Sequence, residues 1–247
     1  VEVYGRLAGV SGRLEKTSIL AEFLLKLKRK GESEWIYLLK GRVVADNDVR
    51  EFGISEQLVI KAISKSFGFK GEDVVKKFRK LGDLGSVAEE FVGKKSQSTL
   101  FSRDLRVKKV FDNLQKVMEV EGKGAVDRKL SLISELLGHA SGGEAKYVIR
   151  SILGDLRVGV ADGVLRDAIA EAFFEEDKKE MAVKVEEAYD LAGDFAIVFE
   201  AAIKGKRALS KVTLVPGKPV KVMLPVKVEE IEEAFRICGA PVALEHK

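Results

Sequence analysis

Apolar residues recur at helical spacing along most of this 247-residue chain. Between Thr17 and Leu27, for example, Ile19, Leu20 and Phe23 fall on one stripe. A stripe of this kind is typical of a helix that buries one face. Similar stripes predict further helices over residues 55–63, 74–81, 107–120, 128–137, 145–152, 164–173, 178–191 and 195–203. The pattern therefore predicts an all-α fold, a compact multi-helix domain, over most of the chain.

The pattern changes near residue 209, and all four prolines lie at or beyond Pro216. Two short runs, 212–215 and 220–224, flank the turn sequence Pro216-Gly217-Lys218-Pro219 and predict two strands. Residues 228–238 predict one more helix. Its inward residues should be Ile231, Ala234 and Phe235, with Cys238 as a small buried side chain at its end.

Residues 242–247 predict a strand that stops abruptly. A chain that ends inside a strand leaves apolar residues unpaired, so we expect this sequence to be a piece of a longer protein. We place a domain boundary within residues 209–216. The expected organisation is a helical domain over 1–211 and the truncated start of a second, β/α domain over 212–247.

The helix junctions carry recognisable capping residues. Ser55 is expected to cap one helix, and Ser141 with Glu144 forms a capping box. Three junctions share a Gly-Asp pair, in which Gly can end one helix and Asp can begin the next segment. They are Gly82-Asp83-Leu84, Gly154-Asp155-Leu156 and Gly193-Asp194-Phe195. The first two suggest an internal duplication, although convergent capping explains them equally well.

Composition narrows the class of protein. With 46% hydrophobic and 33% charged residues the chain reads as soluble and globular, without a membrane span or a secretion signal. The one cysteine excludes an internal disulfide and a cysteine-built zinc site, which favours a cytoplasmic or nucleoid-associated setting over a secreted one. No Cys/His/Asp cluster has metal-ligand spacing, and no P-loop or dinucleotide fingerprint occurs.

Charge is segregated along the chain although the net charge is only +4. Residues 171–200 hold ten acids and three bases, whereas residues 201–221 hold six bases and no acid. Residues 61–80 hold seven bases and two acids, and residues 91–130 hold ten bases and five acids. Such stretches are expected either as solvated helix faces or as a cationic face for a polyanion.

Four glycine-containing helix junctions also carry bases, and helix N-termini with glycine can bind phosphate through free backbone N–H groups. They are residues 138–143 before the helix with Lys146 and Arg150, residues 157–161, residues 204–207, and residues 93–96 before Arg103 and Arg106. Ordinary capping explains each one as well. Together they favour backbone contacts to duplex DNA, and we expect them on one concave surface.

These segments, in this order, resemble the N-terminal part of archaeal-type ATP-dependent DNA ligases. The resemblance is carried by residues 36–42, 82–85, 144–159, 216–224 and 245–247. It implies a helical domain that grips nicked duplex DNA without sequence preference, followed by the start of an adenylation domain. The residues expected to contact the DNA backbone are Lys94, Lys95, Arg103, Ser141, Gly142, Lys146, Arg150, Arg157, Gly159, Lys204, Gly205, Lys206 and Arg207.

The resemblance also assigns catalytic and partner-binding residues. Glu245-His246-Lys247 matches the start of the family's adenylation motif, so Lys247 resembles the lysine that takes AMP from ATP, with Mg²⁺, and Glu245 resembles the adenine contact. His246 departs from the aromatic or apolar residue usual there. Gln97, Leu100 and Phe101 resemble a sliding-clamp-binding box, with Leu100 a mild departure; the alternative is that Leu100 and Phe101 pack into their own core.

The expected function is therefore that of a ligase part acting in DNA replication, repair and recombination, monomeric and inactive alone. Two other hypotheses compete with it. One is a free-standing DNA-binding or clamp-binding adaptor, and the other is a helical protein–protein scaffold whose basic loops are incidental. Binding to nicked DNA over a salt series separates the DNA-binding hypotheses from the scaffold.

Overall fold

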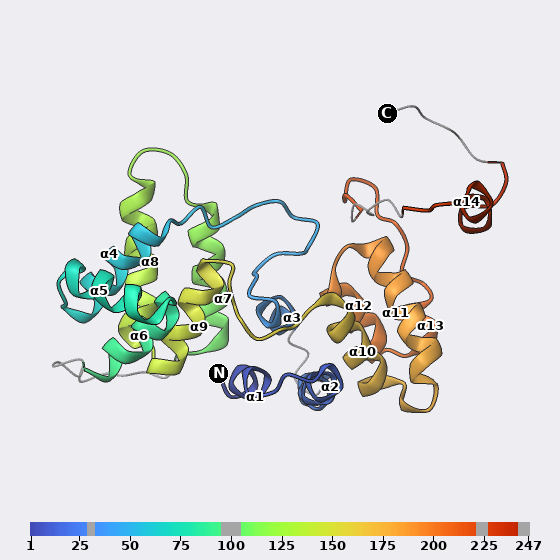
Figure 1. The fold of residues 1–247 in the computed structure, drawn as a ribbon, viewed down its shortest axis with the longest axis horizontal. Coiled ribbons are helices and arrows are strands. Elements are labelled where there is room, and N and C mark those ends of the chain that lie inside the picture. The colour runs from blue at the N-terminus through green and yellow to red at the C-terminus, as the bar shows by residue number, and fades with distance from the viewer. Residues whose placement is uncertain (29–32, 95–104, 221–226, 242–247) are drawn as a thin grey trace.

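The computed structural model describes residues 1–28, 33–94, 105–220 and 227–241, and these are all-α (Figure 1). The first nine helices are α1 (Glu2–Ala8), α2 (Arg13–Lys28), α3 (Glu34–Leu39), α4 (Glu56–Phe67), α5 (Gly71–Leu81), α6 (Leu84–Gly93), α7 (Val107–Glu119), α8 (Ala125–His139) and α9 (Gly142–Ile152). The others are α10 (Asp162–Phe173), a 3₁₀ turn (Glu175–Asp177), α11 (Lys178–Ala192), α12 (Phe195–Ile203), α13 (Lys206–Leu209) and α14 (Ile231–Cys238). The predicted all-α class and the predicted helices are confirmed.

The helices enclose two hydrophobic cores (Figure 1). The first core lies among α4–α9 and includes Ile63 and Leu137, both fully buried. The second lies among α1–α3 and α10–α13 and includes Leu24 and Phe199, also fully buried. Burial of each such side chain stabilises the fold by about 1.5–3 kcal/mol. We call the two parts the α4–α9 lobe and the α10–α13 lobe.

Aromatic side chains join the two lobes. The ring of Tyr4 in α1 lies 4.6 Å from that of Tyr147 in α9, and its hydroxyl donates to the carbonyl oxygen of Leu38. Tyr37 in α3 stacks on Phe111 in α7 at 6.1 Å. Helices α1 and α3 therefore hold the lobes together through the aromatic rings of Tyr4 and Tyr37. The hydroxyl groups of both rings also find hydrogen-bond acceptors.

Two of the three Gly-Asp junctions have the same backbone. Gly82 and Gly193 end α5 and α11 in the left-handed conformation, with φ of 68° and 62°. Asp83 and Asp194 then cap α6 and α12 by accepting backbone N–H groups, with ψ of 114° and 109°. The suspected duplicate at residues 154–155 differs, because Asp155 begins no helix and α10 starts only at Asp162.

The predicted serine caps are confirmed. The Ser55 side chain accepts the N–H of Leu58 at the start of α4. Ser141 and Glu144 form both hydrogen bonds of the capping box at the start of α9. These local rules work because each cap depends only on residues within three positions of it.

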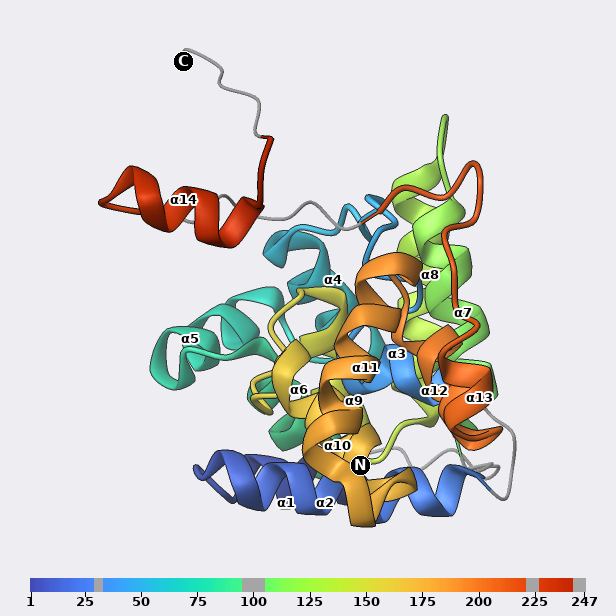
Figure 2. The ribbon, with the colours of Figure 1, turned by 90° about the vertical axis from the view of Figure 1, so that its right-hand side faces the viewer.

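The expectations for the last segment are wrong in part. The predicted strand at residues 212–215 does not form, although the turn at residues 216–218 is present; residues 221–224 and 242–247, where the other strands are predicted, lie outside the described residues. Helix α14 forms as predicted, but Ile231 is 72% and Phe235 46% exposed, and Cys238 is exposed as well. Figure 2 shows α14 standing apart from both lobes. An amphipathic stripe predicts a buried face only where another element packs against it, and α14 has no buried residue.

A substitution at Gly85 tests the packing of α6 on α9. A Cβ atom at Gly85 would lie 2.7 Å from the carbonyl oxygen of Lys146 and 2.8 Å from Cγ of Arg150. We expect Gly85→Ala to lower the free energy of unfolding by about 1–3 kcal/mol, measured by denaturant titration. Gly93→Ala in the same helix meets nothing within 4 Å and should be neutral or stabilising. Equal effects of the two variants would contradict the close packing.

Candidate nucleic-acid interface

Helices α6 and α9 run antiparallel, and ion pairs at two levels define their alignment. Lys146 contacts Glu89 in the second half of α6 at 2.7 Å, whereas Arg150 contacts Asp83 before its start at 2.8 Å. The start of α9, with Ser141 and Gly142, therefore lies toward the end of α6 that carries Lys94. The end of α9 lies beside the junction at Gly82. The junctions before α9 and after α6 therefore lie at one end of the pair, and the junctions before α6 and after α9 lie at the other.

The segment after α9 carries unusual backbone. Gly154 and Gly159 have φ of 69°, and Arg157 has φ of 56°. Arg157 is the one non-glycine residue with positive φ among the residues that the structure describes. A side chain in this conformation costs free energy and is often found at functional sites. The surrounding structure thus maintains the backbone conformation of Arg157, whose guanidinium group lies at the surface.

A polar cavity of about 310 Å³ lies beside this segment. It joins the α5–α6 junction to the end of α9, and its charged lining consists of Glu56, Asp83, Arg150, Asp155 and Arg157. Carboxylates outnumber guanidinium groups in this lining. The cavity is therefore a place where guanidinium groups already have anionic partners, and not an empty anion site.

Lys16 of α2 also reaches this segment. Its Nζ donates to the carbonyl oxygen of Val158 at 2.9 Å and lies against Gly159. Sequence analysis missed Lys16, because it comes from a helix some 140 positions earlier in the chain and no local pattern marks the contact. It adds a cation to the same junction.

The fourth junction belongs to the other lobe. Gly205, with φ of 100°, separates α12 from α13. Lys206 pairs with Asp177, whereas Lys204 and Arg207 have no carboxylate within ion-pair distance in the described parts of the chain. Asp177 lies between α10 and α11, at the end of α10 opposite to Asp162. This junction is therefore separate from those on α9.

The predicted residues thus fall into three places. Lys94, Ser141, Gly142 and Lys146 lie toward one end of the α6–α9 pair; Arg150, Arg157 and Gly159 lie toward the other; Lys204, Gly205, Lys206 and Arg207 lie in the α10–α13 lobe. Lys95, Gln97, Leu100, Phe101, Arg103, Glu245 and Lys247 lie outside the described residues. Any ligand that contacts all three places has to be extended.

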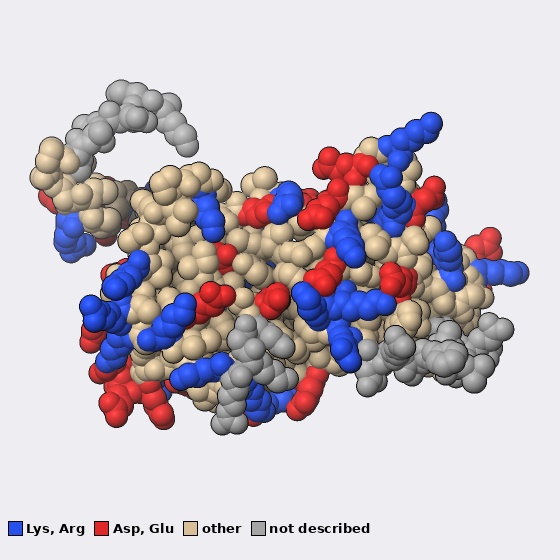
Figure 3. All heavy atoms as spheres, turned by 180° about the vertical axis from the view of Figure 1, so that it is seen from behind, with Lys and Arg blue, Asp and Glu red and all other residues tan. Residues whose placement is uncertain are grey.

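Five of the predicted cations have a carboxylate partner within the chain. The pairs are Lys94–Glu90, Lys146–Glu89, Arg150–Asp83, Arg157–Asp155 and Lys206–Asp177. On the face seen in Figure 3, basic and acidic side chains accordingly alternate and do not form a patch of one sign. The hydrogen bond that Arg157 donates to Asp155 raises the pKa of Arg157, so that group stays charged.

A half-buried ionic cluster fixes the start of α10. The Nζ atom of Lys40 lies 2.5 Å from Asp46 and 2.7 Å from Asp162, the first residue of α10. The hydroxyl of Tyr189 donates to Asp46 at 2.8 Å, and burial raises the pKa of Tyr189. The cluster ties α3 and the loop after it to α10 and α11, and so it holds the far end of the Arg157 segment in place.

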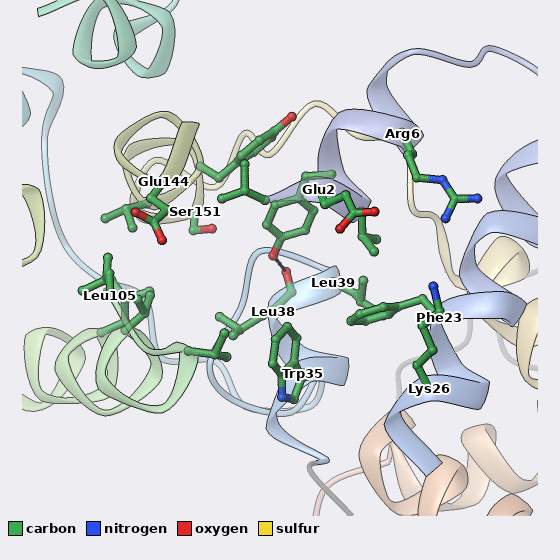
Figure 4. A pocket seen from close by; sticks show the side chains of 18 residues that line it. Glu2, Arg6, Phe23, Lys26, Trp35, Leu38, Leu39, Leu105, Glu144 and Ser151 are labelled. Carbon is green, nitrogen blue, oxygen red and sulfur yellow. Dashed lines mark hydrogen bonds between the residues drawn. The ribbon is translucent and has the colours of Figure 1, made fainter. Parts of the chain in front are cut away.

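A second cavity, of about 350 Å³, lies between the lobes and is mostly apolar. Side chains from α1, α2, α3, α7 and α9 point into it (Figure 4). Its lining contains carboxylates, such as Glu2 and Glu144, but no histidine or cysteine. No metal-binding group of His, Cys, Asp or Glu side chains occurs in the described residues, and no described helix could cross a membrane.

Comparison with known proteins identifies the class. The two-lobed helical fold belongs to the family described as the DNA ligase N terminus, whose model matches residues 1–170. The chain is 40% identical to a protein named DNA ligase from Thermococcus fumicolans, over 99% of the chain and 44% of the relative. It is 37% identical to the DNA ligase of Nanoarchaeum equitans and 34% to that of Nitrosopumilus maritimus, each over 99% of the chain. The chain spans less than half the length of these relatives.

The Asp83–Arg150 pair predicts a pH dependence of stability. Burial raises the pKa of Asp83, but hydrogen bonds from Arg150 and Ser86 outweigh it and lower the pKa to about 2. The pKa of an unfolded Asp is about 3.9. The contribution of Asp83 to the free energy of unfolding is therefore complete above that pH and is lost as the pH falls to about 2. The test uses about 1 M salt, because salt at this concentration screens the ion pairs at the surface. We expect the midpoint of denaturant-induced unfolding to fall more steeply between about pH 4 and 2 for wild type than for Asp83→Asn. Parallel curves would show that Asp83 does not titrate in this way.

Proposed function

We propose that this chain is the part of an ATP-dependent DNA ligase that holds nicked duplex DNA by its phosphate backbone. The observation that carries the proposal is the family match together with the three separate places at which glycine-containing junctions bear cations. An extended polyanion can reach all three junctions, and contacts to phosphate carry no sequence preference. A ligase needs such contacts, because a nick can occur in any sequence.

The proposed boundary lies at residues 211 and 212. The last buried residue in the described parts of the chain is Leu209, where the core of the α10–α13 lobe ends; the core of the α4–α9 lobe ends earlier, at Ile152. Residues 212–247 are proposed to begin the adenylation domain, with Glu245 as the adenine contact and Lys247 as the nucleophile. ATP would supply the adenylyl group and Mg²⁺ would assist its transfer. No candidate ligand cluster for the metal occurs among the described residues.

The same proposal extends to the setting of the enzyme. We propose that the full enzyme acts as a monomer inside the cell, in DNA replication, repair and recombination. Gln97, Leu100 and Phe101 are proposed as its contact with a sliding clamp, since this spacing of a Gln and an aliphatic–aromatic pair suits an anchor for a partner groove.

Binding to a nicked duplex tests the DNA contact and the Arg157–Asp155 pair together. Arg157 must exchange a carboxylate for a phosphate, so Arg157→Gln should weaken binding and lower the slope of log K against log salt by about 1. Asp155→Asn should tighten binding a few-fold, because the guanidinium group is then free. Fluorescence anisotropy over a salt series measures both. No binding of wild type at low salt would favour the protein scaffold, and a change in base preference would contradict backbone contact.

A pull-down with the sliding clamp tests the second contact. We expect Phe101→Ala to abolish retention of the chain on immobilised clamp, because an aromatic anchor supplies most of the binding energy in such a groove. DNA affinity should stay at the wild-type value, which serves as the control for folding. Retention equal to wild type would refute the assignment of Gln97 to Phe101.

A further inference from the structure

The α4–α5 hairpin carries a set of cations that differ from those at the junctions. Seven bases occur in residues 61–80, and one of them, Lys77, pairs with Glu90 at 2.5 Å. The other six have no carboxylate within ion-pair distance in the parts of the chain that the structure describes, and they are Lys61, Lys65, Lys70, Lys76, Arg79 and Lys80. Unpaired cations bind a phosphate without first releasing an acidic partner.

The second half of α5 concentrates this charge. Val74, Val75 and Phe78 pack toward the core of the α4–α9 lobe, so Lys76 and Lys80, four positions apart, lie together on the outer side. Arg79 and Lys80 occupy the last turn of the helix, and both are exposed. The two acids of the helix, Glu72 and Asp73, occupy the first turn, at the opposite end.

This cationic end adjoins the Arg157 segment. Phe78 and Gly82, at the end of α5, line the same polar cavity as Arg157 and Asp155. Figure 1 shows α5 at the outer edge of the α4–α9 lobe, beyond α6. The cationic end of α5 therefore lies next to the Arg157 segment, with the paired charges of the polar cavity between them.

We propose that Lys76, Arg79 and Lys80 form a second contact for the DNA backbone, which extends the bound duplex beyond the Arg157 segment. The proposal rests on the proposed function and adds a surface to it. Residues 76–80 rise by about 6 Å along the helix, which matches about two phosphates of one strand at about 3.4 Å each. A protein partner would need an apolar anchor, and Leu81, 40% exposed, is the one large apolar side chain exposed on α5.

The test compares two variants with the same loss of charge in the chain 1–247. One is Lys76→Gln, Arg79→Gln, Lys80→Gln, which keeps good helix formers at exposed positions. The control is Lys26→Gln, Lys108→Gln, Lys184→Gln, in which each lysine already pairs with a carboxylate four positions away. Circular dichroism establishes that both are folded, and the alanine version of the first set replaces it if the glutamine version is not.

Anisotropy with a nicked duplex over a salt series gives the outcome. We expect the α5 variant to weaken binding at least about tenfold at 0.1 M salt and to lower the salt slope by about 2–3, while the control changes affinity less than about twofold. Trimming the duplex on one side of the nick should remove the difference between wild type and the α5 variant. If wild type and the α5 variant bind alike, the inference is overturned and the proposed function stands. If wild type itself does not bind, the proposed function fails first.

Discussion

The close contact between α6 and α9 is the constraint on which the rest of the α4–α9 lobe depends. Gly85 lets the two backbones approach, since any side chain there would meet the carbonyl oxygen of Lys146. Asp83 accepts the N–H groups that begin α6 and also the guanidinium group of Arg150 from α9. The carboxylate of Asp83 therefore caps the start of α6 and also fixes the position of the end of α9. This shared partner explains why Gly82 and Asp155, which are distant in sequence, line the same polar cavity.

The segment between α9 and α10 is held at both ends. At its start Arg150 is paired with Asp83, and at its end Lys40 lies between Asp46 and Asp162. Lys40 is largely buried, so loss of both carboxylates would leave its charge without compensation, which commonly costs several kcal/mol. Firm ends of this kind can maintain the positive φ of Arg157 between them.

Much of the fold could be predicted from the sequence, because it depends on short-range rules. The stripes predicted ten of the described helices but not α1, α3, α6 or α13, and the caps at Ser55 and Ser141 form as their spacing requires. The site was less predictable. A glycine and a base mark a helix junction, but the carboxylates that neutralise Lys146 and Arg150 come from positions 57 and 67 residues away. The prediction that the apolar stripe of α14 is buried fails for a related reason. Periodicity predicts that one face of a helix is apolar, but it does not say which element covers that face.

The paired cations change how affinity for a polyanion should be understood. A cation that already contacts a carboxylate gains little when it exchanges that partner for a phosphate, because the Coulomb energies and the desolvation costs nearly balance. Five of the predicted cations are in this position. Net affinity should then come from the cations without acidic partners, such as Lys204 and Arg207, and from correct alignment of the paired ones. Under the proposed function, a surface built in this way would hold an extended duplex by many contacts that are each weak and easily released.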